Sequence, residues 1–304
     1  MSIGRGGGLM TITEANSICR AFYRKNNHTE DEEFVFTEAL LFLIKETNDP
    51  RYMMKLGGWY YGQRKFDLAL KYYEMASLLH YPPANECLGY VWYYGRTGVK
   101  DYEKAFNYFK AGMDDGNLVA AYKVADMYKN GYYVEKDYER YKQIIEDLYP
   151  KVCDMKMTND PVPEVFTRLA RIRTEEGRKD EAIRLYLYAK DFLAQRIRYN
   201  PFWGNINIML WLIDDLYKIL EFNPLDFDFF DMHFLIKRPC KVTFKRGRKV
   251  YELEAVDEDG EVHIRFGNKW FRNREEFYRN AEIGTSKATD IYDELTGFEV
   301  TGWT

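Results

Sequence analysis

Internal repetition is the feature that most constrains the fold of this chain. The stretch from Leu88 to Gly95 begins with Leu-Gly and ends in Gly, and a matching stretch runs from Val124 to Gly131. Leu88 and Val124 are 36 residues apart, and so are Gly95 and Gly131. Earlier and later copies are centred on Leu56 and Leu169. A unit of this length buries little apolar surface alone, so neighbouring units must stack, and the pattern predicts an α-α solenoid.

Each unit reads as two helices. The first helix carries a Leu and a large aromatic residue four positions apart, as in Leu88 and Trp92, which places Trp92 in the predicted core. Gly89 follows that Leu and predicts a close approach by the second helix. Glycine then recurs where the first helix has to stop, a position that favours left-handed backbone. These predicted stops are Gly62, Gly95 and Gly131.

Residues 84–112 resemble the Sel-type subfamily of tetratricopeptide-like repeats almost throughout. Residues 120–148 depart from the pattern at Tyr141 and Asp147, where small residues are expected, and this suggests an irregular packing step or the end of the regular array. The resemblance covers about residues 50–195 and implies a scaffold that binds proteins or peptides.

The resemblance also implies which residues meet a partner. In such solenoids the first helices line the concave side, at positions two before, two after and five after the Leu. Some of the tyrosines there have an alternative role in packing against the next unit. The implied groove residues are Met54, Gly58 and Tyr61; Glu86, Tyr90 and Tyr93; Tyr122, Asp126 and Lys129; and Thr167, Arg171 and Thr174.

Helices are also expected on both sides of the repeats. Residues 13–25 and 30–46 read as a helix pair, and Thr29 followed by Glu32 predicts a capping box. An apolar helix is expected over residues 201–221. The predicted organisation is a tail at residues 1–10, the solenoid over 11–222, a linker over 223–237 pinned by its aromatic rings, and a β-rich module over 238–304.

The hydrophobic period changes from 3.6 to 2 near residue 238, which predicts a small antiparallel sheet or barrel. A short helix over 274–281 and a final strand near 298–300 are expected to complete it. Residues 240–270 are loosely similar to the Tudor-like small barrels, which would imply a reader of peptides or nucleic acid.

Charge is strongly segregated in this module. Residues 237–249 hold seven basic residues and no acid, whereas residues 250–262 hold six acids and no base. Either the two strands pair and neutralise each other, or the basic strand forms a nucleic-acid patch. The candidate patch is Lys241, Lys245, Arg246, Arg248 and Lys249.

Composition argues against several function classes. The formal net charge is −4, from 44 Lys and Arg against 48 Asp and Glu, which removes the simplest case for a general polyanion binder. The four cysteines lie far apart, so we expect reduced thiols in a cytosolic protein, with no zinc site. The four histidines form no metal-ligand spacing, and Asp214 and Asp215 point in different directions on a helix. We therefore expect no cofactor, no metal, no membrane span and no enzyme activity.

Three function hypotheses follow. The first is an adaptor whose solenoid groove holds a peptide or protein segment. The second is a nucleic-acid-associated regulator that uses the basic strand of the β-rich module. The third is an enzyme with a site at the junction of solenoid and β module, near Phe202-Trp203 and residues 227–234, although these aromatics are more often core.

Overall fold

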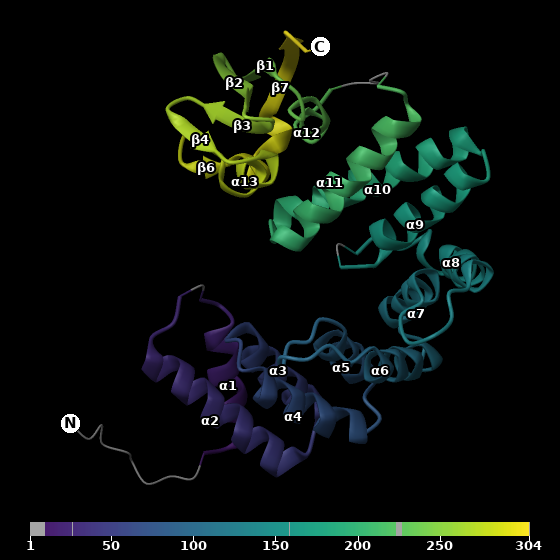
Figure 1. Ribbon diagram of the computed structural model, residues 1–304. Helices are drawn as coiled ribbons and strands as arrows, with labels where there is room; N and C mark the ends of the chain where they lie inside the picture. Colours follow the sequence, from purple (N-terminus) through teal and green to yellow (C-terminus); the bar gives the residue numbers. More distant parts are fainter. Residues whose placement is uncertain (1–9, 26, 158, 223–226, 304) are drawn as a thin grey trace. The chain divides into compact units, whose positions relative to one another are not determined.

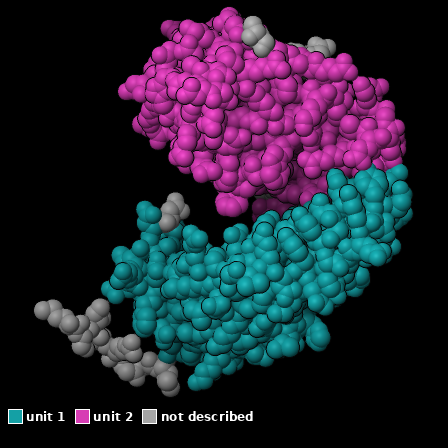
Figure 2. Space-filling model, viewed as in Figure 1, with its two compact units in different colours: residues 1–144 teal, residues 145–304 magenta. Residues whose placement is uncertain are grey.

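Helices occupy the chain as far as residue 235, and strands dominate after that (Figure 1). The computed structural model describes residues 10–25, 27–157, 159–222 and 227–303. The chain divides into two compact units, residues 1–144 and 145–304, coloured separately in Figure 2. The predicted fold class, a mainly helical repeat array followed by an antiparallel β-rich part, is confirmed.

The first unit is built from antiparallel helix pairs. Helices α1 and α2, α3 and α4, and α5 and α6 pack as pairs, and each second helix also packs against the first helix of the next pair. Helix α5 contacts α7 directly. The helices are α1 (Ile12–Phe22), α2 (Glu30–Thr47), α3 (Pro50–Gly62), α4 (Phe66–Leu78), α5 (Pro82–Tyr93), α6 (Tyr102–Asp114), α7 (Leu118–Asn130) and α8 (Tyr138–Val152).

Local sequence explains where these helices begin. The predicted capping box at α2 is confirmed, because the Thr29 side chain accepts from the Glu32 backbone N–H and the Glu32 carboxylate accepts from the Thr29 backbone N–H. Thr11 and Glu14 form the same box at α1. These caps satisfy backbone groups that a helix leaves unpaired at its first turn.

Two of the three predicted glycine stops are confirmed in full. Gly95 and Gly131 have φ angles of 62° and 71°, in the left-handed region. At Gly62 the helix α3 ends as predicted, but the left-handed backbone expected there falls at Arg64, with φ of 59°. The chain turns two residues later than the glycine.

The placement of Trp92 also needs correction. Val91 is the fully buried residue of this turn, and Trp92 is only half-buried. The Lys104 ammonium lies 4.0 Å from the centroid of the Trp92 ring. Trp92 therefore packs at the edge of the α5–α6 pair and is covered by the lysine.

The division between the two units falls within α8, in the part of the sequence that departs from the repeat pattern. The departing residue Tyr141 is 1% exposed and fully packed. In the second unit, α10 packs against both α9 and α11. Its helices after α8 are α9 (Val162–Glu175), α10 (Lys179–Tyr199), α11 (Trp203–Ile219), α12 (Met232–Leu235) and α13 (Arg274–Asn280).

Five strands of the described residues form an antiparallel sheet in the order β4-β3-β2-β1-β7, and β5 pairs separately with β6. Inward-facing residues such as Val242, Phe244 and Leu253 are fully buried, as the period of 2 predicts. The likeness to a Tudor-like barrel and the independence of residues 238–304 stay predictions. The strands are β1 (Cys240–Arg246), β2 (Lys249–Glu258), β3 (Glu261–Phe266), β4 (Lys269–Phe271), β5 (Glu282–Ile283), β6 (Ser286–Lys287) and β7 (Leu295–Thr301).

The stretch predicted as a linker, residues 223–237, contains α12 and packs tightly where it is described. Phe229 and Phe230 are each 1% exposed, which agrees with the expectation that aromatic rings pin this stretch. The Tyr278 hydroxyl on α13 donates to the backbone carbonyls of both phenylalanines. Residues 223–226 and the predicted tail, apart from Met10, lie outside the described residues.

Candidate partner-binding surface

Tyrosines from α5 and α7 meet on one face of the first unit. The hydroxyl oxygens of Tyr90 on α5 and Tyr122 on α7 lie 3.3 Å apart. The Lys123 ammonium lies 5.2 Å, 5.6 Å and 5.5 Å from the ring centroids of Tyr90, Tyr93 and Tyr122. We call Tyr90, Tyr93, Tyr122, Lys123 and Asp126 the tyrosine surface. A cation within about 6 Å of several rings is attracted by their negative faces, so the lysine and tyrosines hold one another in place.

A polar link between α5 and α7 positions this surface. The Asn117 side chain caps α7 by accepting from the Ala120 backbone N–H at 2.8 Å. Its amide nitrogen also donates to the Glu86 carboxylate on α5 at 2.9 Å. Burial raises the pKa of Glu86, while the hydrogen bond from Asn117 opposes that rise. Glu86, predicted as a groove residue, is thus part of the link between the two helices.

The surface continues along further aromatic residues. The Tyr93 ring makes edge contacts with Tyr94, Tyr102 and Tyr132, at centroid distances of 5.1 Å, 5.5 Å and 6.0 Å. The rings of Tyr102 and Tyr132 stack at 4.5 Å. Tyr132 comes from the turn after α7, so the stop at Gly131 carries it into the cluster.

The tyrosines Tyr90 and Tyr93 have raised pKa values. Burial is the main cause that raises the pKa of Tyr90, with Tyr122 adding to it. Burial also raises the pKa of Tyr93, and the nearby Asp126 carboxylate contributes. Both phenols therefore stay protonated at neutral pH and offer hydrogen bonds together with apolar ring area. Tyr90 and Tyr93 are half-buried, whereas Tyr122 is only 6% exposed and contacts Tyr90 and Lys123 from beneath the surface. Half-buried aromatic residues with a few charges are typical of the residues that dominate protein interfaces.

Two predicted groove residues of the first unit lie beside the tyrosine surface. Tyr61 on α3 accepts a hydrogen bond at 2.9 Å from Nε of Arg96, in the loop after α5. The Arg96 guanidinium also lies 5.1 Å from the Tyr94 ring. The Lys129 ammonium, one turn beyond Asp126, lies 4.9 Å from the ring of Tyr141. Sequence reasoning missed Lys123 and Arg96, because neither stands at a repeat position associated with binding.

Two of the remaining predicted groove residues, Met54 and Gly58, lie on α3, and the other three belong to α9 in the second unit. Thr167 is only 6% exposed, so it offers a partner little surface. The Thr174 hydroxyl donates to the Ala170 carbonyl of its own helix at 2.8 Å. Nε of Arg171 donates to the Asp215 carboxylate on α11 at 2.7 Å. Of the three, Arg171 is the residue whose charged group reaches a neighbouring helix.

Two of the five residues in the candidate basic patch, Lys241 and Arg246, lie against acidic partners. Strands β1 and β2 pair, the cross-strand partner of Lys241 is Glu254, and the Lys241 ammonium lies 3.5 Å from that carboxylate. Nε of Arg246 donates to Glu294 at 2.8 Å. The Lys249 ammonium lies 5.0 Å from the Tyr251 ring, while Lys245 and Arg248 are exposed.

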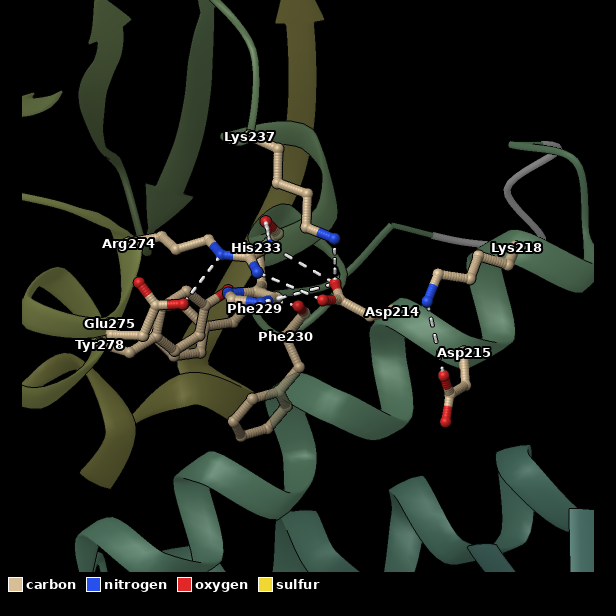
Figure 3. Close-up of polar contacts among 10 residues, drawn as sticks. All are labelled: Asp214, Asp215, Lys218, Phe229, Phe230, His233, Lys237, Arg274, Glu275 and Tyr278. Atoms are coloured by element: carbon tan, nitrogen blue, oxygen red, sulfur yellow. Dashed lines mark hydrogen bonds and ion pairs between the residues drawn. The ribbon is translucent and has the colours of Figure 1, made fainter. Parts of the chain in front are cut away.

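A polar network joins the helical part of the second unit to its β-rich part (Figure 3). The Asp214 carboxylate on α11 lies 2.5 Å from the Lys237 ammonium and 3.2 Å from a guanidinium nitrogen of Arg274 on α13. His233 on α12 is fully buried, with Nε2 3.6 Å from Asp214. Asp215 turns instead toward Arg171 and Lys218, so the two neighbouring aspartates diverge, as predicted. The charged groups of this network are paired with one another, and the pair between Asp214 and Arg274 holds α11 against α13.

None of the helices in the described part of the chain is long and apolar enough to cross a lipid bilayer. No protein-family model matches the sequence, and no curated protein matches it either.

Comparison with solved structures finds similarity to helical repeat proteins. A Sel1 repeat protein from Oxalobacter formigenes is 21% identical. The match covers 70% of this chain and 82% of the Oxalobacter protein, with a TM-score of 0.48. A protective antigen of uropathogenic Escherichia coli that displays an SLR fold is 16% identical, over 73% of this chain and 51% of its own, with a TM-score of 0.46. A tetratricopeptide repeat protein from Parabacteroides merdae is 16% identical, and the match covers 69% of this chain and 74% of that protein, with a TM-score of 0.43.

Proposed function

We propose that this protein is a non-catalytic scaffold that binds a peptide or protein segment on the tyrosine surface. The observation that carries the proposal is the arrangement of Tyr90, Tyr93 and Tyr122 around the Lys123 ammonium on two adjacent helices. Tyrosines held in this way lose little conformational entropy when a partner docks. The half-buried Tyr90 and Tyr93 also supply apolar ring area and hydroxyl groups, while Tyr122, only 6% exposed, holds Tyr90 in place.

The alternative function, nucleic-acid binding through the basic strand, has less support. Lys241 and Arg246 are each paired with a glutamate, so their charge is partly neutralised before any phosphate arrives. Phosphate binding depends on cations that release counterions when they meet the backbone. Only a partner that displaces Glu254 or Glu294 would gain from these two residues.

Site-specific photo-crosslinking tests the proposed surface. A photoreactive phenylalanine analogue is placed at Tyr93, and at Leu78 as the matched control, because Leu78 is 80% exposed but lies on α4, outside the tyrosine surface. We expect a discrete crosslinked species from position 93 in the native cells. The partner protein in this species is then identified and purified, and its affinity for this protein is measured by calorimetry. Equal crosslinking from both positions, or a purified partner with no measurable affinity, would contradict the proposal.

A further inference from the structure

A second surface, unrelated to the tyrosine surface, lies on the first helix pair. The groove between α1 and α2 forms a pocket of about 280 Å³. Its apolar lining comes from Ile18, Ala21 and Phe22 on α1 and from Val35 on α2. Its charged lining residues are Lys25, Asp31 and Glu32. We call it the α1–α2 groove. Val35 remains 44% exposed, so the apolar lining is open to solvent.

The floor of the groove is firmly held. Phe22 is 6% exposed, and its ring stacks on Phe36 at 4.0 Å and on His28 at 3.6 Å. Trp59 on α3 meets the edge of the same ring at 5.1 Å. A ring fixed on three sides keeps the groove open without a partner, and a preformed groove loses little entropy when it is filled.

Acidic residues stand at one end of the groove. Helix α2 begins with four consecutive acids, Glu30 to Glu33. Lys25 pairs with Glu32, and the Gln63 amide donates to Glu33. Within the described residues no ion pair engages Glu30 or Asp31. The groove therefore offers an apolar floor beside an excess of negative charge, and it is complementary to a basic, amphipathic ligand.

We propose that the α1–α2 groove binds an amphipathic helix that presents two large apolar side chains one turn apart, flanked by Lys or Arg. The volume supports two side chains, because a cavity of about 150 Å³ is enough for one benzene ring. A groove between two helices accepts a third helix through side chains on one face. The basic flanks would meet Glu30 and Asp31.

The probe is a fluorescein-labelled helical peptide of about 15 residues, long enough to form a helix. It is made of Ala and Lys and carries two Phe one turn apart. A control peptide has Glu at every Lys position. Binding to the full chain is followed by fluorescence anisotropy, and methyl NMR signals of Ile18 and Val35 report the location. We expect the basic peptide to bind at least ten-fold more tightly than the acidic one and to shift both methyl signals.

Variants of α1 and α2 make the test specific. Ala21→Lys fills the groove with a charged chain and should abolish binding of the basic peptide. Asp31→Lys should weaken it by about five-fold, as for one exposed charge pair. Glu38→Lys is the matched control, since Glu38 is exposed on the same helix but does not line the groove, and it should change nothing. Tyr93→Ala should also bind the peptide normally, which separates this surface from the proposed function.

Four outcomes would overturn the proposal. Equal affinity for both peptides would mean that charge plays no part, and the absence of binding would remove the site. Binding that appears only after deletion of residues 1–9 would identify the chain's own N-terminus as the occupant. A dimer that Ala21→Lys dissociates would identify a second copy.

Discussion

The ring of Phe109 on α6 occupies the space that a side chain on Gly89 of α5 would need. An ideal Cβ at residue 89 would lie 2.5 Å from two carbons of that ring, far inside van der Waals contact. Phe109 is fully buried and cannot swing away. The same relationship joins Gly57 and Tyr73 in the preceding repeat, where the distance would be 2.6 Å. These glycines set how closely the two helices of a repeat approach.

Gly89→Ala should therefore lower the free energy of unfolding by about 1–3 kcal/mol, the usual cost of overpacking a core. Gly58→Ala is the matched control: this helical glycine has the Tyr73 hydroxyl at 3.9 Å as its nearest neighbour. It should gain about 0.5–1 kcal/mol from better helix propensity. Urea melts of both variants against the wild type measure the difference. A Gly89→Ala protein as stable as the wild type would contradict the packing described.

The helical array could be predicted from sequence because its packing repeats. Gly89 and Gly57 follow a leucine in two copies, and this regularity is visible without coordinates. The end of α3 at Gly62 is predicted correctly, but the left-handed residue after it is Arg64, which no glycine marks in the sequence. Trp92 was misplaced because Lys104, from the next helix, covers it.

The tyrosine surface was only partly accessible from sequence. Helical periodicity brings Tyr90 and Tyr93 to one face, whereas the hydroxyl contact between Tyr90 and Tyr122 depends on how α5 and α7 stack. Lys123 precedes the core residue Val124, and its ammonium contacts three tyrosine rings. The spacing of residues in the sequence does not predict where so long a side chain ends. The network around Asp214 joins residues up to 60 positions apart, which no local pattern records.

Truncation at the tyrosine surface should weaken partner binding. Tyr93→Ala should reduce affinity for the crosslinked partner about thirty-fold, as for an interface aromatic worth about 2 kcal/mol. Tyr90 is better changed to Phe, because its ring packs edge-on against Phe109 at 5.4 Å and its loss would leave a cavity. Calorimetry with thermal melts separates binding from folding. Tyr133→Ala, at an exposed ring next to Phe106, is the control and should bind normally.

Removing the Lys190 cation should destabilise the second unit. The Lys190 ammonium lies 2.7 Å from the Asp231 carboxylate and 2.8 Å from that of Asp228, and the Asp231 side chain is only 2% exposed. Lys190→Met would leave Asp231 buried without its cation and should cost about 3 kcal/mol or more.

The double variant Lys190→Met/Asp231→Asn should be more stable than Lys190→Met alone, since it removes the uncompensated charge. Lys179→Met breaks the exposed pair with Glu221 and should change stability by less than about 1 kcal/mol. Chemical denaturation of these three variants and of Asp231→Asn alone provides the measurement. Additive losses in the double variant would show that the two residues are not coupled.

The buried histidine should make stability fall in mild acid. Burial lowers the pKa of His233 well below its ordinary value, and the Arg274 and Lys237 cations add to this effect, while Asp214 and Tyr278 are its other close polar neighbours. In the unfolded chain the imidazole binds a proton near pH 6.5, but in the folded chain it does not. The unfolded state therefore holds more protons below that pH, and stability should drop by up to about 1.4 kcal/mol per pH unit as pH falls.

His233→Phe should remove this dependence with little other loss, because neither ring nitrogen has a hydrogen-bond partner among the described residues. Burial raises the pKa of Asp231 to about 6, which acts in the opposite sense, since the folded state then binds the proton more readily. The quantity to measure is thus the difference between variant and wild type, from urea melts between pH 7.5 and 5. Below about pH 6.5 the free energy of unfolding of His233→Phe should rise relative to that of the wild type. His263→Gln, on β3, is the control. Parallel pH profiles for His233→Phe and the wild type would contradict the prediction, because they would show that His233 titrates alike in the folded and unfolded states.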